Sequence, residues 1–335
     1  MAYRCSIYGL GVVANRNIPG VPASSTVEPD VCITFGSLPA WLQEASATQV
    51  ETSYVTDYQD DCGTPVLRVF RVLDGKYHQF CYADQTKFVV DRSGREIWAE
   101  WSEPLTLEDT ATYLLGPIMG FVLLLRGLVC LHASAIAVDQ RAIALVGPAG
   151  SGKSTTAAAF SDRGFLVLAE DVVALDDRGD DRGDHFLVRP AYPCIRLWPA
   201  SVKALYGTES HLPRLTPNWD KRYLDLTERP EQFQLESLPL AAIYLLGERC
   251  NDPRAPFVKS LDRAEALMSL VANTYATKLM DKQMRAREFE VLTRVLRSVP
   301  LRRVTPHTDP ARIPELSDAI LSDFDRHGFS LMNTD

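Results

Sequence analysis

Short runs that alternate apolar and polar residues dominate the first 105 positions of the chain. Val66 to Val72 alternates in this way and is followed by Asp74-Gly75, a typical hairpin turn, so Tyr77 to Tyr82 is predicted as the return strand. Residues 40–62 are polar and acidic, which predicts a loose connection. The meander is expected to continue through strands at 86–90 and 96–101, joined by a turn at Ser93-Gly94. We therefore expect a β-rich N-terminal domain over residues 1–105.

A longer apolar segment follows, and it predicts a connecting helix over residues 106–126 that begins at Thr106 with an acidic first turn. Leu114 to Leu131 is strongly apolar, but Pro117 and Arg126 interrupt it. A bilayer span needs about 20 predominantly apolar residues. The pattern therefore favours a buried helix followed by a strand, and no membrane partner is expected.

From residue 128 onward, strand and helix patterns mix. Leu128–Val138 and Arg141–Val146 are separated only by Asp139-Gln140, which predicts a tight antiparallel hairpin in place of a parallel crossover. Residues 207–222 lack periodicity and form a candidate mobile lid. Further strands are predicted at 165–169, 172–175, 186–189 and 241–246, and helices at 155–163, 262–272, 283–298 and 310–325. These patterns predict an α/β domain over residues 106–335.

Composition narrows the class of protein. The chain has 335 residues, enough for two domains, and its 46% hydrophobic and 23% charged residues are ordinary for a soluble globular protein. A net charge of −8 argues against a general nucleic-acid binder. The seven cysteines form no Cys-x-x-Cys pair, and the chain begins without a long apolar segment, so we expect reduced thiols and a cytoplasmic protein. The acidic repeat over 176–184 is interpreted as a solvated loop tip and not as a metal site.

One motif carries the most chemistry: Gly147-Pro148-Ala149-Gly150-Ser151-Gly152-Lys153-Ser154, between a predicted strand and a helix that opens at Thr155. Two glycines spaced in this way let backbone N–H groups curl around a phosphate, and the helix N-terminus favours the same negative charge. Lys153 is then expected to reach the β- and γ-phosphates, and Ser154 to hold Mg²⁺. Residues 147–155 thus predict a nucleoside triphosphate site, with ATP and Mg²⁺ as the ligands.

The acidic pair Glu170-Asp171 follows an apolar strand just after the helix of the motif. Phosphoryl transfer needs one carboxylate on the metal and another that accepts the proton of the attacking group. We assign Asp171 as the base and Glu170 to the metal, with Ser154, Glu170 and Asp171 as the candidate metal ligands; the reverse assignment stays open. The alternative is a solvated turn.

Three further features are ambiguous. His132 lies in an apolar strand, where a histidine either packs in the core or orients the acceptor or a carboxylate. Arg196 either stabilises charge on the transferred group or stacks beside Tyr192 and Trp198. Lys221-Arg222 either clamps a phosphate or peptide carboxylate or is a solvated pair.

In order and approximate spacing, Leu131–Ser134, the 147–154 motif and Gly164–Asp171 resemble the catalytic domain of HPr kinase/phosphorylase and of bacterial HPr-kinase-like serine kinases. The resemblance continues through Arg189–Pro199 and Pro239–Tyr244, so it covers roughly residues 112–305. It implies a P-loop core of the type shared with phosphoenolpyruvate carboxykinase, with a mixed sheet, and γ-phosphoryl transfer from ATP to a serine hydroxyl. It also implies active-site roles for His132, Lys153, Ser154, Glu170 and Asp171.

The chain departs from that family in two places. Glu170 stands where the family has the first aspartate of an Asp-Asp pair, so a reverse phosphorylase reaction is not implied. The first 105 residues do not resemble the N-terminal domain of the sugar-regulatory enzymes, so HPr is not the expected substrate. Related stand-alone kinases modify ribosomal peptides, including the C-terminal serine of lasso peptide precursors, and this chain looks closer to those.

We therefore expect a serine kinase acting on a peptide or protein, with residues 1–105 recognising the acceptor. The alternatives are a small-molecule kinase or carboxykinase-like phosphoryl transferase, and a non-catalytic nucleotide-binding sensor. The nucleobase preference and the oligomeric state stay open, a homo-oligomer included.

Overall fold

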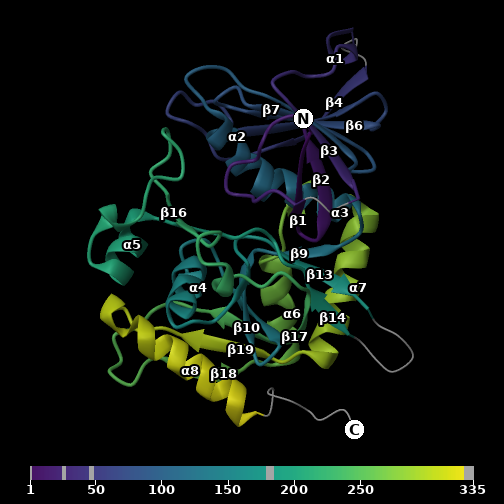
Figure 1. The fold of residues 1–335 in the computed structure, drawn as a ribbon. Coiled ribbons are helices and arrows are strands. Elements are labelled where there is room, and N and C mark those ends of the chain that lie inside the picture. The colour runs from purple at the N-terminus through teal and green to yellow at the C-terminus, as the bar shows by residue number, and fades with distance from the viewer. Residues whose placement is uncertain (1, 25–27, 45–48, 179–184, 328–335) are drawn as a thin grey trace. The chain divides into compact units, whose positions relative to one another are not determined.

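The computed structural model describes residues 2–24, 28–44, 49–178 and 185–327, and its contacts divide the chain into two compact units (Figure 1). The first unit comprises Met1–Gly127 with Thr216–Asn218 and Ala276–Asp281. The second comprises Leu128–Leu215, Trp219–Tyr275 and Lys282–Asp335. Part of the acidic repeat, residues 179–184, lies outside the described residues.

The boundary between the units lies at Gly127 and not at residue 105, because the helical segment after residue 106 packs with the N-terminal strands. Phe121 of that segment contacts the rings of Phe80 and His78, with centroids 5.2 and 4.9 Å apart. Its apolar side chains are therefore part of the core of the first unit.

An eight-stranded sheet, in the order β1-β2-β3-β8-β7-β6-β5-β4, forms most of the first unit. The meander β5–β8 has the expected antiparallel pairing. Strand β4 and the short helix α1 fall in the stretch that was expected to be a loose connection, and β1–β3 were not expected. The bounds are β1 (Tyr3–Ile7), β2 (Leu10–Ala14), β3 (Val31–Phe35), α1 (Trp41–Glu44), β4 (Val50–Val55), β5 (Leu67–Val72), β6 (Tyr77–Tyr82), β7 (Lys87–Asp91) and β8 (Glu96–Glu100).

The connecting helix has three parts: α2 (Leu107–Tyr113), a π-helical turn η2 (Leu114–Ile118) that contains Pro117, and α3 (Met119–Leu125). It begins as expected at Thr106, whose side chain accepts from the Asp109 backbone while the Asp109 side chain accepts from the Thr106 backbone. Leu107–Leu125 is long and apolar enough to cross a membrane, but 78% of its most apolar window is buried, as in the core helix of a globular domain.

The second unit is built on a mixed nine-stranded sheet with the main order β12-β10-β11-β17-β14-β13-β9. Strand β17 runs parallel to β11 and to β19, whereas the other pairs are antiparallel. Strands β15 (Cys194–Leu197) and β16 (Arg222–Asp225) form a separate antiparallel pair. The strands of the large sheet are β9 (Val129–Leu131), β10 (Ala133–Val138), β11 (Arg141–Val146), β12 (Val167–Ala169), β13 (Val173–Asp177), β14 (Phe186–Val188), β17 (Leu238–Leu246), β18 (Phe257–Ser260) and β19 (Leu301–Thr305).

The expected hairpin is present between β10 and β11, and its two turn residues, Asp139 and Gln140, both have positive φ, 48° and 59°. Two positive φ values match the twist of the flanking strands. The strand expected over 128–138 is, however, divided at His132 into β9 and β10.

A second break, at Glu170-Asp171, divides β12 from β13, as expected. The two breaks face each other because β10 pairs with β12 whereas β9 pairs with β13. The flanking partners are Ala135 with Ala169 and Leu131 with Val173. This register places His132 opposite the acidic pair.

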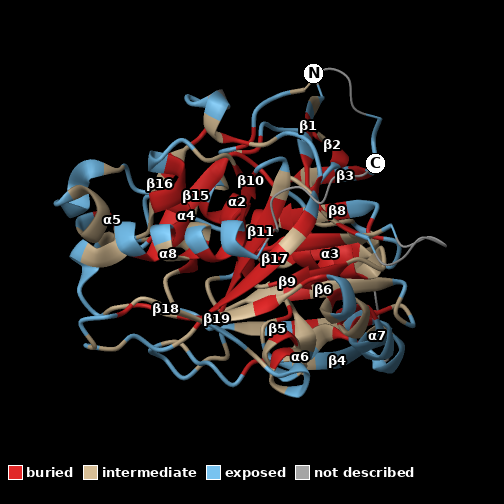
Figure 2. Ribbon diagram, turned by 90° about the horizontal axis from the view of Figure 1, so that it is seen from below, coloured by how far each residue is buried: buried red, intermediate tan, exposed pale blue. Residues whose placement is uncertain are grey.

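The helices of the second unit complete its core. Phe160 of α4 and Phe324 of α8 share one hydrophobic cluster with Ile143 and Tyr244 of the sheet, and Figure 2 shows the buried residues concentrated along β11 and β17. The main helices are α4 (Lys153–Asp162), α5 (Pro199–Tyr206), α6 (Arg263–Ala272), α7 (Lys282–Ser298) and α8 (Ile313–Arg326). The short 3-10 turns described in this unit are η3 (Glu209–His211), η4 (Pro230–Gln232) and η6 (Pro310–Arg312), whereas η5 (Thr277–Leu279) belongs to the first unit.

Candidate active site

The loop over residues 147–154 joins the carboxyl end of β11 to α4. A Cβ atom on Gly147 would lie 2.7 Å from Ser151 Oγ and 2.9 Å from the Leu246 carbonyl, and Gly147 has a φ of +155°. Gly152 caps α4 with a φ of +104° and without a side-chain hydrogen bond. The first-turn N–H groups of α4 therefore receive no side-chain cap, which suits an anion.

Two polar side chains of this loop, Lys153 and Ser151, can make further hydrogen bonds to a ligand. The Lys153 ammonium donates to the carbonyls of Gly147 and Pro148, at 2.8 and 3.1 Å, and the residue is only 6% exposed. Burial lowers its pKa, although the charges of Asp171 and Glu170 act to raise it. Ser151 Oγ is buried and has no hydrogen-bond partner within the described residues. Both groups are suited to the oxygens of a phosphate.

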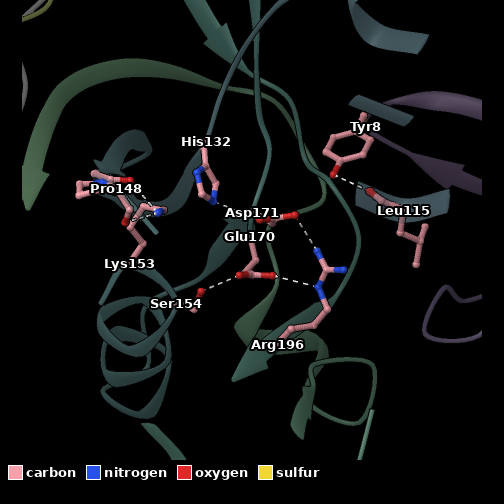
Figure 3. Close-up of polar contacts among 10 residues, drawn as sticks. Tyr8, Leu115, His132, Pro148, Lys153, Ser154, Glu170, Asp171 and Arg196 are labelled. Atoms are coloured by element: carbon pink, nitrogen blue, oxygen red, sulfur yellow. Dashed lines mark hydrogen bonds and ion pairs between the residues drawn. The ribbon is translucent and has the colours of Figure 1, made fainter. Parts of the chain in front are cut away.

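Glu170 links the loop helix to Arg196 (Figure 3). Its Oε1 accepts from the Ser154 hydroxyl at 2.7 Å, and its Oε2 lies 3.3 Å from Arg196 Nε. The residue is 5% exposed. Ser154 and the first carboxylate of the acidic pair are thus in direct contact.

Asp171 lies at the break between β12 and β13 and turns the chain with a φ of +72°. A short polar side chain tolerates this left-handed conformation better than most. Its Oδ2 accepts from Arg196 Nη2 at 3.0 Å, and its Oδ1 lies 3.4 Å from His132 Nε2. Burial raises the pKa of Asp171, but the hydrogen bond from His132 and the charges of Arg196 and Lys221 outweigh it, so the pKa lies well below its ordinary range.

His132 and Arg196 hold that carboxylate from two sides. The His132 backbone donates to the Asn273 carbonyl at 2.8 Å, and its ring meets Tyr275 edge-on, with centroids 6.2 Å apart. The guanidinium of Arg196 lies 6.0 Å from the centre of the Tyr192 ring. Burial acts to lower the pKa of Arg196, but Tyr192 and the two carboxylates raise it well above its ordinary value.

The predicted residues thus form one connected cluster and several separate contacts. His132, Ser154, Glu170, Asp171 and Arg196 are joined by hydrogen bonds and ion pairs. Lys153 contacts its own loop instead. Of the two partners expected for a stacked Arg196, Tyr192 is present, whereas the Trp198 ring is exposed and has the Lys221 ammonium near one face. Outside the cluster, Thr155 Oγ1 donates to Ser201 Oγ at 2.8 Å, and Arg222 pairs with Asp220 at 3.2 Å.

A cavity of ≈ 1070 Å³ adjoins the loop, with His132 and residues 148–151 in its lining. Two cations that also line it, Arg249 and Arg303, belong to no motif in the sequence and were not predicted. Arg249 Nη2 donates to the Ser151 carbonyl at 3.4 Å, and Arg303 pairs with Glu265 at 2.7 Å. Only the strand order could have indicated Arg249. It follows β17, which runs parallel to β11, and parallel neighbours bring their carboxyl ends to the same edge of a sheet.

The oxygens in this cluster fit Mg²⁺ that arrives with a nucleotide. Within the part of the chain that the structure describes, no three His, Cys, Asp or Glu side chains are grouped to hold a metal by themselves. Mg²⁺ in nucleotide sites commonly takes one or two carboxylates together with substrate phosphates. Ser154 Oγ and Glu170 Oε1, 2.7 Å apart, supply two hard oxygens of that kind.

No protein-family model matches the chain, and no curated protein matches it either. Among solved structures, it is similar to the HPr(Ser) kinase/phosphatase from Coxiella burnetii. The identity is 12%, the match covers 59% of this chain and 97% of that chain, and the TM-score is 0.34. This is a distant likeness of fold, so a function has to be inferred from the site.

Proposed function

We propose that this protein is an ATP-dependent kinase that transfers the γ-phosphoryl group to a serine hydroxyl of a peptide or protein. The observation that supports this most directly is the 2.7 Å bond between Ser154 and Glu170, with Asp171 as the next residue. It sets two carboxylates beside the first turn of the helix that follows a phosphate-binding motif. A protein that only bound nucleotide would not need both carboxylates.

In this mechanism the backbone N–H groups of the 147–154 loop bind the β-phosphate of ATP. Lys153 leaves the loop carbonyls and donates to the β- and γ-phosphate oxygens, and Ser151 offers its hydroxyl. Ser154 and Glu170 would hold Mg²⁺, which neutralises negative charge on the phosphates. Positioning and charge stabilisation of this kind supply most of the rate in phosphoryl transfer.

Asp171 is the proposed proton acceptor. The serine oxygen attacks the γ-phosphorus, the bond from that phosphorus to the β–γ bridging oxygen breaks, and the serine proton passes to Asp171 Oδ1 or Oδ2. The products are phosphoserine and ADP. Its low pKa keeps Asp171 ionised when the serine arrives but makes it a weak base, so the proton moves to it only as the new bond to phosphorus forms. His132 and Arg196 fix its orientation, and Arg196 compensates the charge of both carboxylates.

The cavity beside the loop is the proposed binding site for the acceptor. His132 lies in its lining and 3.4 Å from Asp171, so a serine bound there is led to the proton acceptor. Its volume of ≈ 1070 Å³ is at the upper end of the range of about 300–1,000 Å³ that is usual for ligand sites, so it has room for a peptide segment. A ribosomal peptide, a lasso precursor included, is a candidate from the resemblance alone.

Incubating the protein with Mg²⁺ and ATP labelled at the γ-position, with and without serine-containing peptides, tests the proposal. Phosphoserine identified by mass spectrometry is the expected product. Lys153→Met should abolish it, because the variant keeps the side-chain bulk but loses the cation. Bound but unchanged ATP across a broad peptide library would contradict the proposal and favour a sensor. Phosphorylation of small molecules only would indicate the small-molecule kinase.

A further inference from the structure

Trp198 is an exposed aromatic residue close to the candidate active site. It is 59% exposed, among the few large apolar side chains with this much free surface in the described chain. Its backbone is well anchored, because it follows β15 directly and caps α5, with a proline at the first helical position. A large aromatic side chain held out on a fixed backbone is suited to binding a flat ligand.

Trp198 lies in the chain between two residues that contact the candidate site, Arg196 before it and Ser201 after it. Its backbone is extended, with φ −71° and ψ 151°, so side chains two positions apart point to the same side, and Trp198 shares a face with Arg196. Arg196 bonds both carboxylates. The first turns of α4 and α5 are joined by the 2.8 Å bond from Thr155 to Ser201. Trp198 thus caps a helix whose first turn is bonded to the first turn of α4.

Lys221 shows that the ring can receive a partner. The pairing of β15 with β16 sets Leu197 opposite Arg222, so the next positions outward are Trp198 and Lys221. The Lys221 ammonium lies 5.1 Å from the centre of the indole ring.

The in-line geometry of phosphoryl transfer indicates which part of the nucleotide lies near the Trp198 ring. The attacking and leaving oxygens lie roughly in line on opposite sides of the γ-phosphorus. If the serine arrives from the cavity on the His132 side, the leaving oxygen of ADP lies on the opposite side of the γ-phosphorus. The nucleoside then extends over the first turn of α4 and toward α5. Trp198, the N-cap residue of α5, is an exposed aromatic residue on that side of the loop helix.

We propose that the indole ring of Trp198 is the stacking platform for the nucleobase of the triphosphate. This rests on the proposed function, since it takes the 147–154 loop to bind the phosphates. Stacking on an aromatic ring accepts any base, because every base has a π-face. The platform therefore predicts that ATP and GTP bind with similar affinity, unlike inorganic tripolyphosphate, which has no base.

Calorimetric titration of the full-length protein with Mg·ATP, Mg·GTP and magnesium tripolyphosphate tests the platform. Trp198→Leu should weaken both nucleotides about tenfold and leave tripolyphosphate within twofold, whereas Trp198→Phe should retain most of the nucleotide affinity. Phe289→Leu is the matched control, since Phe289 is 53% exposed on α7 of the same unit. Nucleotide, but not tripolyphosphate, should also quench tryptophan emission, and this change should disappear in Trp198→Leu.

Three outcomes separate the inference from the function beneath it. Equal weakening of all three ligands by Trp198→Leu would overturn the platform, because the residue would then only position the loop. Unchanged nucleotide affinity in a folded Trp198→Leu protein would overturn it too. If the unmodified protein bound neither nucleotides nor tripolyphosphate, the proposed function itself would fail.

Discussion

At the scale of single residues, Asp171 combines an uncommon backbone conformation with a charge held from two sides. Its φ of +72° suits aspartate and asparagine, whereas most other side chains are strained there. Asp171→Asn therefore removes the charge with little backbone cost. Asp171→Ala removes the charge and adds about 1–2 kcal/mol of strain. Comparing these two variants separates the chemistry of the carboxylate from the shape of the turn.

We predict that Asp171→Asn lowers the turnover rate by about a hundredfold or more, the usual contribution of a general base. ATP affinity should change little, because Lys153 and the loop are untouched. Single-turnover rates and calorimetric ATP titrations would measure the two quantities. A turnover rate equal to that of the unmodified protein would refute the assignment of the base.

The low pKa of Asp171 also predicts how stability depends on pH. An ionised carboxylate stabilised in the folded state contributes fully above its ordinary pKa of about 3.9, and the contribution disappears as the pH falls through the lower folded value. Asp171→Asn should thus reduce the free energy of unfolding by about 1.5–3 kcal/mol at pH 7. The difference should persist to about pH 4 and narrow below it. Urea unfolding at pH 7 and pH 3 would show whether it does; an unchanged difference at pH 3 would exclude the charge as its source.

At the scale of elements, the β10–β11 hairpin has a non-glycine residue, Gln140, at a turn position that favours glycine. Gln140 has a φ of +59°, where glycine is preferred, and Asp-Gly is a favoured pair for a turn with two positive φ values. Gln140→Gly should raise the free energy of unfolding by about 0.5–1 kcal/mol, part of the left-handed penalty being offset by the freer unfolded chain. Gln140→Val, β-branched at the same φ, should lower it. Denaturant midpoints would rank the three proteins, and the reverse order would contradict the assigned turn.

The elements that the sequence predicts well are those with local signals. The β5–β8 meander, the β10–β11 hairpin and the capping box at Thr106 all depend on turn or cap residues within a few positions. Strand β4 was missed because it lies at a sheet edge with most of its side chains exposed, so it has no buried alternation. Strand β19 reads Leu-Arg-Arg-Val-Thr and depends on pairing with β17, nearly 60 residues earlier in the chain.

The candidate site shows the same limit. The loop, the acidic pair and His132 could be singled out from residue order, because motif and strand end coincide. The contact between His132 and Asp171 depends on the pairing of β9 with β13 and of β10 with β12. No local sequence pattern predicts this pairing. The positions of Arg249 and Arg303 near the loop could not be predicted, because they depend on parallel strands that are distant in sequence.

At the scale of the whole molecule, the chain has two units, and the loop belongs to only one of them. A ligand that binds only the folded form stabilises it by about 2.7 kcal/mol at a concentration about 100 times its Kd. ATP and Mg²⁺ should therefore slow amide exchange about a hundredfold in β10, β11 and β17, and leave β5–β8 unchanged. Hydrogen-exchange mass spectrometry would test this, with Lys153→Met as the control. Equal protection in both units would show that they unfold as one.

Arg196 sets a constraint on any redesign of this protein. Two N–H donors of its planar guanidinium contact the carboxylates of Glu170 and Asp171. The second oxygen of each carboxylate contacts another group, the Ser154 hydroxyl in Glu170 and the His132 imidazole in Asp171. A lysine carries the same charge but concentrates it at one point and lacks the fork. Exchange of Arg196 for lysine would thus lose one of the two carboxylate contacts even though the net charge of the pocket stayed the same.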